Sequence, residues 1–283
     1  MDKNRFVIIA GTSRAGTTSL FRWLSQHPEI GAAKLKETRF FLDGNYPLPN
    51  PAEAQPGKVY DDFFETKDIA SGKVLLESSP DYLYGADPER IKRTLPDVKI
   101  IVILRNPVDR FLSWFKYAKQ RQLIPANTDV KKFLSLQSAT IDPEKHVHQF
   151  AFLQGHYEPF VSKFQNTFSG NLLVVNFADL TEKTGETMEA ICDYIGIDGI
   201  YFRDNVFETH NRSLNGSHPV LNRYYKIRRA VAYRVVRYQW LLDIFRVLNS
   251  PIKKVITSLS RSSKSEISSS DYRIVEEAYK VIK

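Results

Sequence analysis

Cysteine is nearly absent from this chain of 283 residues, and Cys192 is the only one. A lone cysteine excludes an intramolecular disulfide framework and a cysteine-based metal site. No apolar run approaches the roughly 20 residues that a membrane-spanning helix needs. The apolar stretch at residues 6–10 is also too short for the core of a signal peptide. These absences lead us to expect a soluble, cytoplasmic protein.

Low-complexity sequence is scarce as well. Hydrophobic residues make up 42% of the chain and charged residues 25%, which is typical of globular proteins and not of disordered ones. There is no internal repeat and no clear linker, and the serine-rich stretch at 258–270 is short. We therefore expect a single domain over residues 1–283, with an α/β core at 1–200 and a basic, helical or loop part at 201–283.

Positive charge is concentrated in one segment. The chain has a net charge of +8, but residues 221–264 hold eleven Lys and Arg against one acid, which leaves −2 for the rest. Aromatic residues are interleaved with these cations: Tyr224, Tyr225, Tyr233, Tyr238 and Trp240. The segment fits a surface for a membrane, a polyanion or an anionic acceptor. A solvated helix with a buried aromatic stripe fits it equally well.

Alternating strands and helices predict the fold class. Apolar runs predict strands at residues 6–10, 73–77, 98–104 and 171–177. Helical patterns follow Gly16, begin at Pro107 and run from about Thr184 to Gly196, and a last helix follows the serine-rich stretch. Residues 45–57 are proline-rich and predict a loop. This order predicts a three-layer, P-loop-like α/β fold, with a central, mostly parallel sheet flanked by helices.

Residues 11–18 have the spacing of a phosphate-binding loop. Gly11 and Gly16 stand five apart, between a strand and a helix, and a hydroxyl pair follows. Backbone N–H groups at such a turn converge on an anion, and the helix dipole adds partial positive charge. The lysine of the ATP-binding version is missing, because its position is Thr17, and the cation of the loop is Arg14. An ordinary strand-to-helix turn has the same glycine pattern.

A second anion site is predicted at the end of the strand at 98–104. This strand brings Arg105 to the carboxyl edge of the sheet, where open α/β folds bind ligands. Ser113 follows eight residues later, just over two helical turns along. An arginine fork and a hydroxyl can together hold a phosphate. Taken singly, Arg105 could instead cap the helix and Ser113 could be solvated.

Four sequence strings carry a family resemblance. GTSRAGTTSL (11–20) and IVILRNPVDRFLSWF (101–115) resemble the sulfotransferases that use 3′-phosphoadenosine-5′-phosphosulfate. KETRFF (36–41) and LLESSPDYLY (75–84) resemble the acceptor-side segments of the heparan-sulfate and related carbohydrate sulfotransferases. The resemblance covers roughly residues 5–200.

The resemblance implies a set of nucleotide-binding residues. The 5′-phosphosulfate loop would be formed by Gly11, Thr12, Ser13, Arg14, Ala15, Gly16, Thr17 and Thr18. Arg105 and Ser113 match the arginine and serine that hold the 3′-phosphate in this family. A late segment resembles the family's loop over the nucleotide only weakly, and it comprises Asn215, Gly216 and Ser217.

The resemblance also implies the reaction. A sulfuryl group would pass in line to a hydroxyl, with an amine as the second choice, of a carbohydrate or glycolipid, and adenosine-3′,5′-bisphosphate would be released without help from a metal. Glu37 would act as general base and Arg14 would stabilise the leaving phosphate. Lys36, Glu77 and Asp81 would bind the acceptor. From its neighbours alone, Glu37 is better explained as a surface glutamate paired with Lys36 or Arg39.

Two positions depart from the family pattern. Arg14 stands where the family usually has lysine, and Ser78 stands where the heparan-type segment has a lysine after its glutamate. Lys34 or Lys36 would then supply the missing charge. Two other functions fit parts of the sequence: a P-loop small-molecule kinase and a nucleic-acid-binding protein. Thr17 in place of lysine argues against the kinase, and we expect no nucleic-acid partner.

Overall fold

The computed structural model describes residues 5–50, 57, 59–203, 207 and 267–281. The chain divides into two compact units, one formed by Met1–Arg110 with Ser138–Asn211 and the other by Phe111–Gln137 with Arg212–Lys283. The basic segment at 221–264 and the expected nucleotide loop at 215–217 lie outside the described residues. The organisation of residues 1–283 as a single domain therefore stays a prediction.

The first unit is built on a five-stranded sheet. Its order is β2-β3-β1-β4-β5, and every neighbouring pair is parallel. The strands are β1 (Arg5–Gly11), β2 (Ile30–Ala32), β3 (Val74–Ser78), β4 (Lys99–Leu104) and β5 (Leu172–Asn176). Four of them confirm the strands predicted from apolar runs. The fifth, β2, has only three residues, too few for a recognisable pattern.

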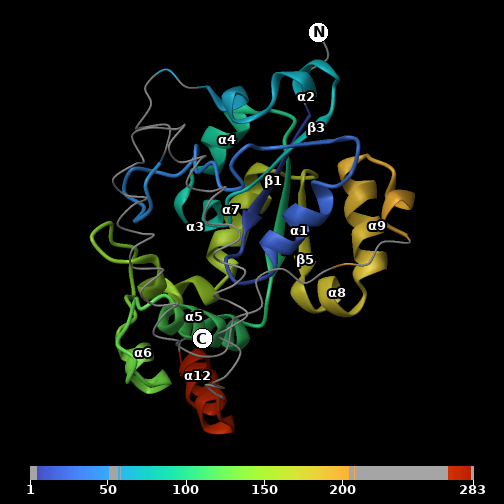
Figure 1. Cartoon of the computed structure of the whole chain (residues 1–283). Coiled ribbons are helices and arrows are strands. Elements are labelled where there is room, and N and C mark those ends of the chain that lie inside the picture. The colour runs from blue at the N-terminus through green and yellow to red at the C-terminus, as the bar shows by residue number, and fades with distance from the viewer. Residues whose placement is uncertain (1–4, 51–56, 58, 204–206, 208–266, 282–283) are drawn as a thin grey trace, which may run out of the picture. The chain divides into compact units, whose positions relative to one another are not determined.

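Helices cover both faces of this sheet, as Figure 1 shows. One face packs against α1 (Thr17–Leu24), α8 (Phe177–Glu182) and α9 (Thr184–Ile195). The other packs against α3 (Tyr82–Gly85), α4 (Pro88–Thr94) and α7 (Glu158–Thr167). The predicted three-layer α/β fold is confirmed. The remaining elements of this unit are short: η1 (Tyr60–Phe63), α2 (Thr66–Ala70), η2 (Val147–Phe150), η3 (Leu153–Gly155) and η4 (Gly199–Phe202).

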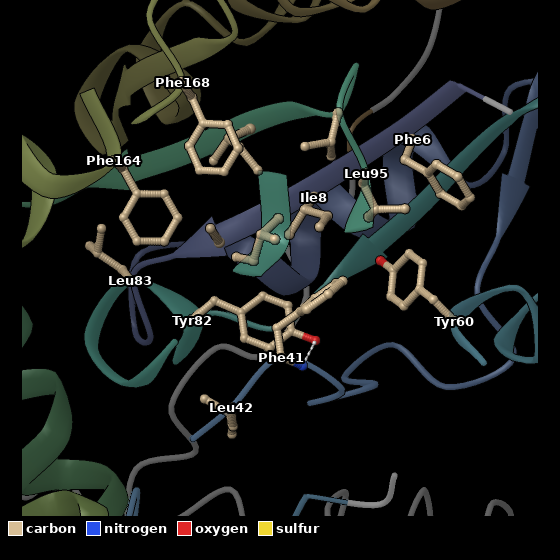
Figure 2. Packing of buried hydrophobic residues seen from close by; sticks show 14 of the residues in the cluster. Phe6, Ile8, Phe41, Leu42, Tyr60, Tyr82, Leu83, Leu95, Phe164 and Phe168 are labelled. Carbon is tan, nitrogen blue, oxygen red and sulfur yellow. Dashed lines mark hydrogen bonds between the residues drawn. The ribbon is translucent and has the colours of Figure 1, made fainter. Parts of the chain in front are cut away.

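Strand alternation divides the core into two clusters. In β1, Val7 and Ile9 face the α1 side, whereas Phe6 and Ile8 face the α7 side. Figure 2 shows Ile8 in the second cluster together with aromatic rings from distant segments. Because β1 is buried on both faces, a shift of one residue in its register would exchange the two sets of side chains. The packing therefore fixes where β1 ends and the loop after it begins.

The second unit is helical in its described part. It holds most of α5 (Pro107–Gln120), α6 (Val130–Ser135) and α12 (Ser269–Val281), and α12 contacts α6. The rings of Phe111 and Phe133 lie 5.1 Å apart within it. The start of α5 at Pro107 and the presence of a last helix confirm the predictions. No helix in the described ranges is both long enough and apolar enough to span a bilayer.

Candidate functional site

The sequence-predicted site residues of the first unit gather at one edge of the sheet. Parallel strands end at the same edge, and here β1 ends at Gly11, β3 at Ser78 and β4 at Leu104. The register pairs Ile8 with Glu77 and Gly11 with Val102. The phosphate loop, the Glu77 segment and Arg105 therefore follow three adjacent strand ends.

The loop after β1 has the backbone of an anion site. Gly16 takes φ 87°, and a Cβ atom there would lie 3.1 Å from Cε2 of Phe177. Glycine is therefore required both by conformation and by space. Gly16 is also the N-cap of α1 and has no side chain to bond the first N–H groups of the helix. The N–H groups of Thr17 and Thr18 begin the helix at this end, where the helix dipole favours an anion.

Arg105 braces this loop from the end of β4. Its Nη1 donates a hydrogen bond to the carbonyl of Arg14 at 3.1 Å. Its guanidinium lies 4.7 Å from the ring centre of Phe177, the same ring that faces Gly16. Tyr157 donates to the carbonyl of Arg105 at 2.8 Å. Arg105 thus stands beside the loop, and its part in a second anion site stays a prediction.

The other predicted 3′-phosphate residue, Ser113, lies on α5 within the second unit. Its pairing with Arg105 stays a prediction. Asn215, Gly216 and Ser217 lie outside the described residues, so their role also stays a prediction.

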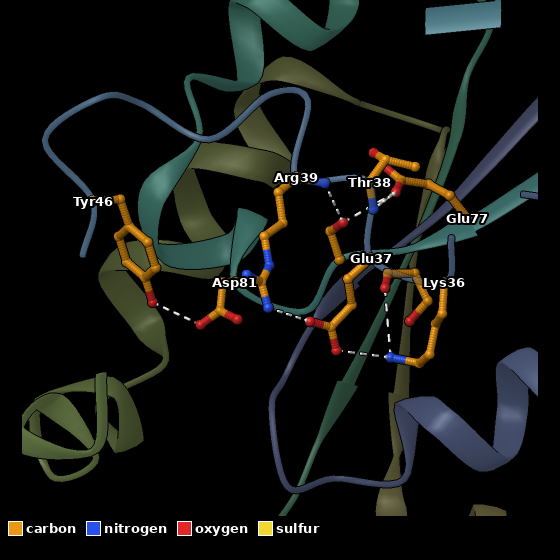
Figure 3. A network of polar contacts seen from close by, with 9 residues as sticks. Lys36, Glu37, Thr38, Arg39, Tyr46, Glu77 and Asp81 are labelled. Carbon is orange, nitrogen blue, oxygen red and sulfur yellow. Dashed lines mark hydrogen bonds and ion pairs between the residues drawn. The ribbon is translucent and has the colours of Figure 1, made fainter. Parts of the chain in front are cut away.

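Glu37 is held between two cations. Arg39 Nη2 lies 2.8 Å from one carboxylate oxygen, and Lys36 Nζ lies 3.4 Å from the other, as Figure 3 shows. Burial alone would raise the pKa of Glu37, but the charges of Lys36 and Arg39 outweigh it and hold the pKa below its ordinary value. The side chain is still 35% exposed. Glu37 is therefore an ionised, oriented carboxylate that can accept a proton.

The segment that carries Glu37 is held in place by hydrogen bonds to residues at and just after the end of β3. Glu77 Oε2 accepts the backbone N–H of Thr38 at 3.2 Å and the hydroxyl of Ser79 at 3.0 Å. Ser79 Oγ in turn accepts the backbone N–H of Arg39 at 3.1 Å. Tyr82 accepts the backbone N–H of Phe41 at 3.3 Å. Three backbone groups just after Glu37 are thus fixed by residues some forty positions away.

Glu77 and Asp81 occupy different positions from Glu37. Glu77 is 0% exposed, and burial raises its pKa against the hydrogen bonds from Thr38, Tyr82 and Ser79. Asp81 is 7% exposed and accepts a hydrogen bond from Tyr46 at 2.7 Å, and burial raises its pKa too. The described contacts of Glu77 and Asp81 are with protein groups. Their predicted contact with an acceptor stays a prediction.

The structure distinguishes the two candidate lysines. Lys34 Nζ reaches the carbonyl of Asp62 at 3.3 Å, in an exposed position. Lys36 Nζ lies 3.5 Å from the carbonyl of Ser78, the position where the resembling family has lysine. Burial lowers the pKa of Lys36, and the neighbouring carboxylate of Glu37 opposes that shift. Of the two, Lys36 brings its ammonium to the Glu37 side of the site.

Sequence reasoning missed the residues that act through hydrogen bonds to distant backbone. Ser79 and Tyr82 belong to the LLESSPDYLY string, but nothing in it signals their bonds to residues 39 and 41. Tyr46, whose hydroxyl bonds the side chains of Asp81 and Gln154, was missed as well, because it lies in the proline-rich stretch, where no periodic pattern is present.

The histidines in the described part of the chain show no metal-ligand geometry. His146 and His148 stack with ring centres 5.7 Å apart, and burial, helped by His146, lowers the pKa of His148 to about 4. Within the described ranges, no three or more His, Cys, Asp and Glu side chains gather where they could hold a metal ion.

Known proteins share both the sequence pattern and the fold. The model of the sulfotransferase family matches residues 7–201. Human bifunctional heparan sulfate N-deacetylase/N-sulfotransferase 2 is 28% identical over 198 residues, which is 67% of this chain and 22% of that protein. Mouse bifunctional heparan sulfate N-deacetylase/N-sulfotransferase 4 is 25% identical over 202 residues, which is 68% of this chain and 22% of that protein. The matched part thus spans about a fifth of the length of these curated relatives.

A solved structure resembles the chain over most of its length. The sulfotransferase from Alicyclobacillus acidocaldarius gives a TM-score of 0.60 at 22% identity, and the match covers 87% of this chain and 100% of that one. At this identity the likeness establishes a shared fold.

Gly16→Ala tests the loop. The variant adds a Cβ at positive φ and 3.1 Å from the Phe177 ring, so it should unfold about 2–3 kcal/mol more easily than wild type. Gly72→Ala is the matched control, because Gly72 has φ +69° with nothing within 4 Å of the added atom, and only the backbone strain of about 1 kcal/mol should remain. Urea denaturation measures both, and equal losses would contradict the close approach to Phe177.

Glu77→Gln tests the buried carboxylate. Burial raises the pKa of Glu77 in the folded protein above its value in the unfolded chain. The contribution of this carboxyl group to the free energy of unfolding therefore falls as the pH rises from the unfolded-state pKa to the folded-state pKa. The fall is about 1.4 kcal/mol for each tenfold difference in proton affinity between the two states. The stability of wild type relative to Glu77→Gln should therefore fall as the pH rises above the ordinary pKa of a glutamate. Urea unfolding at several pH values measures this difference, with the exposed Glu186→Gln on α9 as control. A difference that does not change with pH would show that burial does not raise the pKa of Glu77.

Proposed function

We propose that this chain, which belongs to the sulfotransferase family, transfers a sulfuryl group from 3′-phosphoadenosine-5′-phosphosulfate to a carbohydrate. The expected family membership is confirmed by the family match and by the relatives. The observation that carries the proposal is the placement of an ionised carboxylate, Glu37, and a phosphate-type loop on the same edge of the sheet. The kinase and nucleic-acid alternatives have no comparable support.

The loop residues fit a nucleotide donor. The amides at the start of α1 suit a 5′-phosphate, and Arg105 beside the loop suits a second phosphate. When bound, the donor supplies a sulfuryl group and a leaving bisphosphate. Arg14, Thr17 and Thr18 would bind that phosphate more strongly as it gains charge, which lowers the barrier to transfer.

Glu37 would accept the proton of the acceptor. The acceptor oxygen forms a bond to sulfur, the bond from sulfur to the phosphate oxygen breaks, and the acceptor proton passes to Glu37. Lys36 and Arg39 keep Glu37 ionised and oriented. The same two charges make Glu37 a weaker base. Lys36 and Arg39 therefore orient the carboxylate but reduce the driving force for proton transfer to it.

A carbohydrate acceptor is supported by the relatives, which are named for heparan sulfate. We propose a hydroxyl as the acceptor group. A glycolipid is also a candidate acceptor, because its sugar offers the same hydroxyl group. Contact of the segment at 221–264 with a membrane or polyanion remains part of this proposal.

An amine is the second candidate acceptor, because the relatives are named as N-sulfotransferases. Radiolabelled donor should sulfate both glucosamine oligosaccharides with free amines and the same oligosaccharides after N-acetylation if a hydroxyl is the acceptor. Labelling of the free-amine form alone would replace the hydroxyl with the amine. Labelling of neither form would point away from amino sugars.

Glu37→Gln tests the base. Loss of a positioned base should lower kcat by about 100-fold or more, whereas the Kd for adenosine-3′,5′-bisphosphate should change less than about twofold because Glu37 lies on the acceptor side. The exposed Glu65→Gln is the control. Turnover measured with labelled donor decides the matter, and retained turnover would remove Glu37 from this role.

Arg105→Ala tests the second anion site. Loss of a charge-assisted hydrogen bond should weaken adenosine-3′,5′-bisphosphate by about 10- to 100-fold, but ADP by only a few-fold through the bond to Arg14. Isothermal titration calorimetry measures both, with exposed Arg93→Ala as control. Equal weakening would show that Arg105 does not bind the 3′-phosphate. In wild type, a preference for ADP with magnesium would favour a kinase instead.

A further inference from the structure

Arg110 is a fully buried arginine that touches the phosphate loop from inside the protein. It lies in the first turns of α5 and is 0% exposed. Its Nε donates to the carbonyl of Ser13 at 3.0 Å, and its Nη2 lies 3.4 Å from the hydroxyl of the same residue. A planar guanidinium that bonds both the backbone and the side chain of Ser13 restricts the loop at that point.

The rest of this guanidinium reaches away from the loop. Nη1 donates to the carbonyl of Ala151 and Nη2 to the side-chain oxygen of Gln154, each at 3.0 Å. The ring of Tyr84 lies 5.6 Å from the guanidinium carbon. Tyr84 also donates its hydroxyl proton to the carbonyl of Gln154 at 3.0 Å, which fixes the backbone of that residue.

Gln154 continues the network to Tyr46 and Asp81. Its Nε2 donates to the hydroxyl of Tyr46 at 2.9 Å, and Tyr46 donates to Asp81 Oδ1 at 2.7 Å. Figure 3 shows Asp81 between Tyr46 and the Glu37 ion pairs. Each of these three side chains is at most 7% exposed, so water competes little for the bonds.

The donors and acceptors of this network can be arranged in only one direction. Arg110 can only donate, so the oxygen of Gln154 must face it and the NH₂ group must face Tyr46. The hydroxyl of Tyr46 accepts that bond, so its single proton goes to Asp81. The Tyr46 ring packs directly on the backbone of Gly85, where even an added Cβ would clash with it. Reversal of one member would leave a buried polar group unpaired.

We propose that Arg110, Gln154 and Tyr46 are positioning residues that couple the phosphate loop to the acceptor side of the site. One end of the network is Ser13, within the donor loop. The other is Asp81, whose carboxylate lies beside the ion pairs of Glu37 and Arg39. The coupling holds the phosphate loop and the acceptor side at a fixed position relative to each other, as in-line transfer requires. This role in transfer rests on the proposed function.

Tyr46→Phe is the test, because it removes one hydroxyl at the far end of the network and leaves the ring in place. Backbone hydrogen exchange of the loop peptide, residues 11–24, should become about three- to tenfold faster in the free protein, the size expected for one buried hydrogen bond. Tyr194→Phe is the matched control, since its hydroxyl bonds the carbonyl of Ile100 at 3.2 Å, outside this network. Loop exchange unchanged from wild type would overturn the proposal.

A double-mutant cycle with Arg110→Lys tests the route. Lysine keeps the charge but loses the fork, so Tyr46→Phe should add no further increase in loop exchange in that background. Additive increases would show that the effect does not pass through Arg110 and would also overturn the proposal. If Arg110→Lys does not fold, Tyr46→Phe alone still decides.

Nucleotide binding separates this inference from the proposed function. Tyr46→Phe should weaken adenosine-3′,5′-bisphosphate about three- to tenfold by calorimetry, whereas Tyr194→Phe should not. Wild type that fails to bind the bisphosphate would reject the proposed donor, and the hydrogen-exchange result would still test the coupling. Wild type that binds it, with Tyr46→Phe unchanged in both measurements, would reject the coupling alone.

Discussion

The parallel pairing of β1 between β3 and β4 determines the position of every group in the candidate site of the first unit. It places the loop after Gly11, the Glu77 segment and Arg105 at consecutive strand ends. Ile8 and Ile9 are 0% exposed and face opposite helix layers, so the register is fixed by packing on both faces. The geometry of the groups at this edge therefore depends on the packing of a strand that is buried on both faces.

The carboxylates near this edge have different pKa values because their surroundings differ. Glu37 stands partly exposed between two cations and has a lowered pKa, whereas Glu77 and Asp81 are buried and have raised pKa values. Separation of pKa values among neighbouring acids is a common basis for distinct roles. The ionised carboxylate suits proton transfer, and the buried ones suit support: Glu77 through Thr38 and Ser79, and Asp81 through Tyr46.

The local patterns predicted the framework well. Apolar runs identified four strands, and the glycine spacing identified the loop, because both depend on residues adjacent in sequence. The three-residue β2 was missed because so short a strand has no period. The resemblance, and not its own neighbours, predicts Glu37 as a general base, and that role stays a prediction. The supporting contacts were out of reach: Arg110 bonds Ser13 across 97 positions and Gln154 bonds Tyr46 across 108, so no window along the chain contains both partners.

The partial exposure of the ion pairs around Glu37 links the site to ionic strength. Lys36, Glu37 and Arg39 are 20%, 35% and 26% exposed, so dissolved ions reach the groups whose charges lower the pKa of Glu37. Screening weakens both pairs, because the Debye length contracts to about 3 Å at 1 M salt. Salt therefore moves the pKa of Glu37 upward and loosens its orientation together. The medium in which the protein works sets how strong a base this carboxylate is.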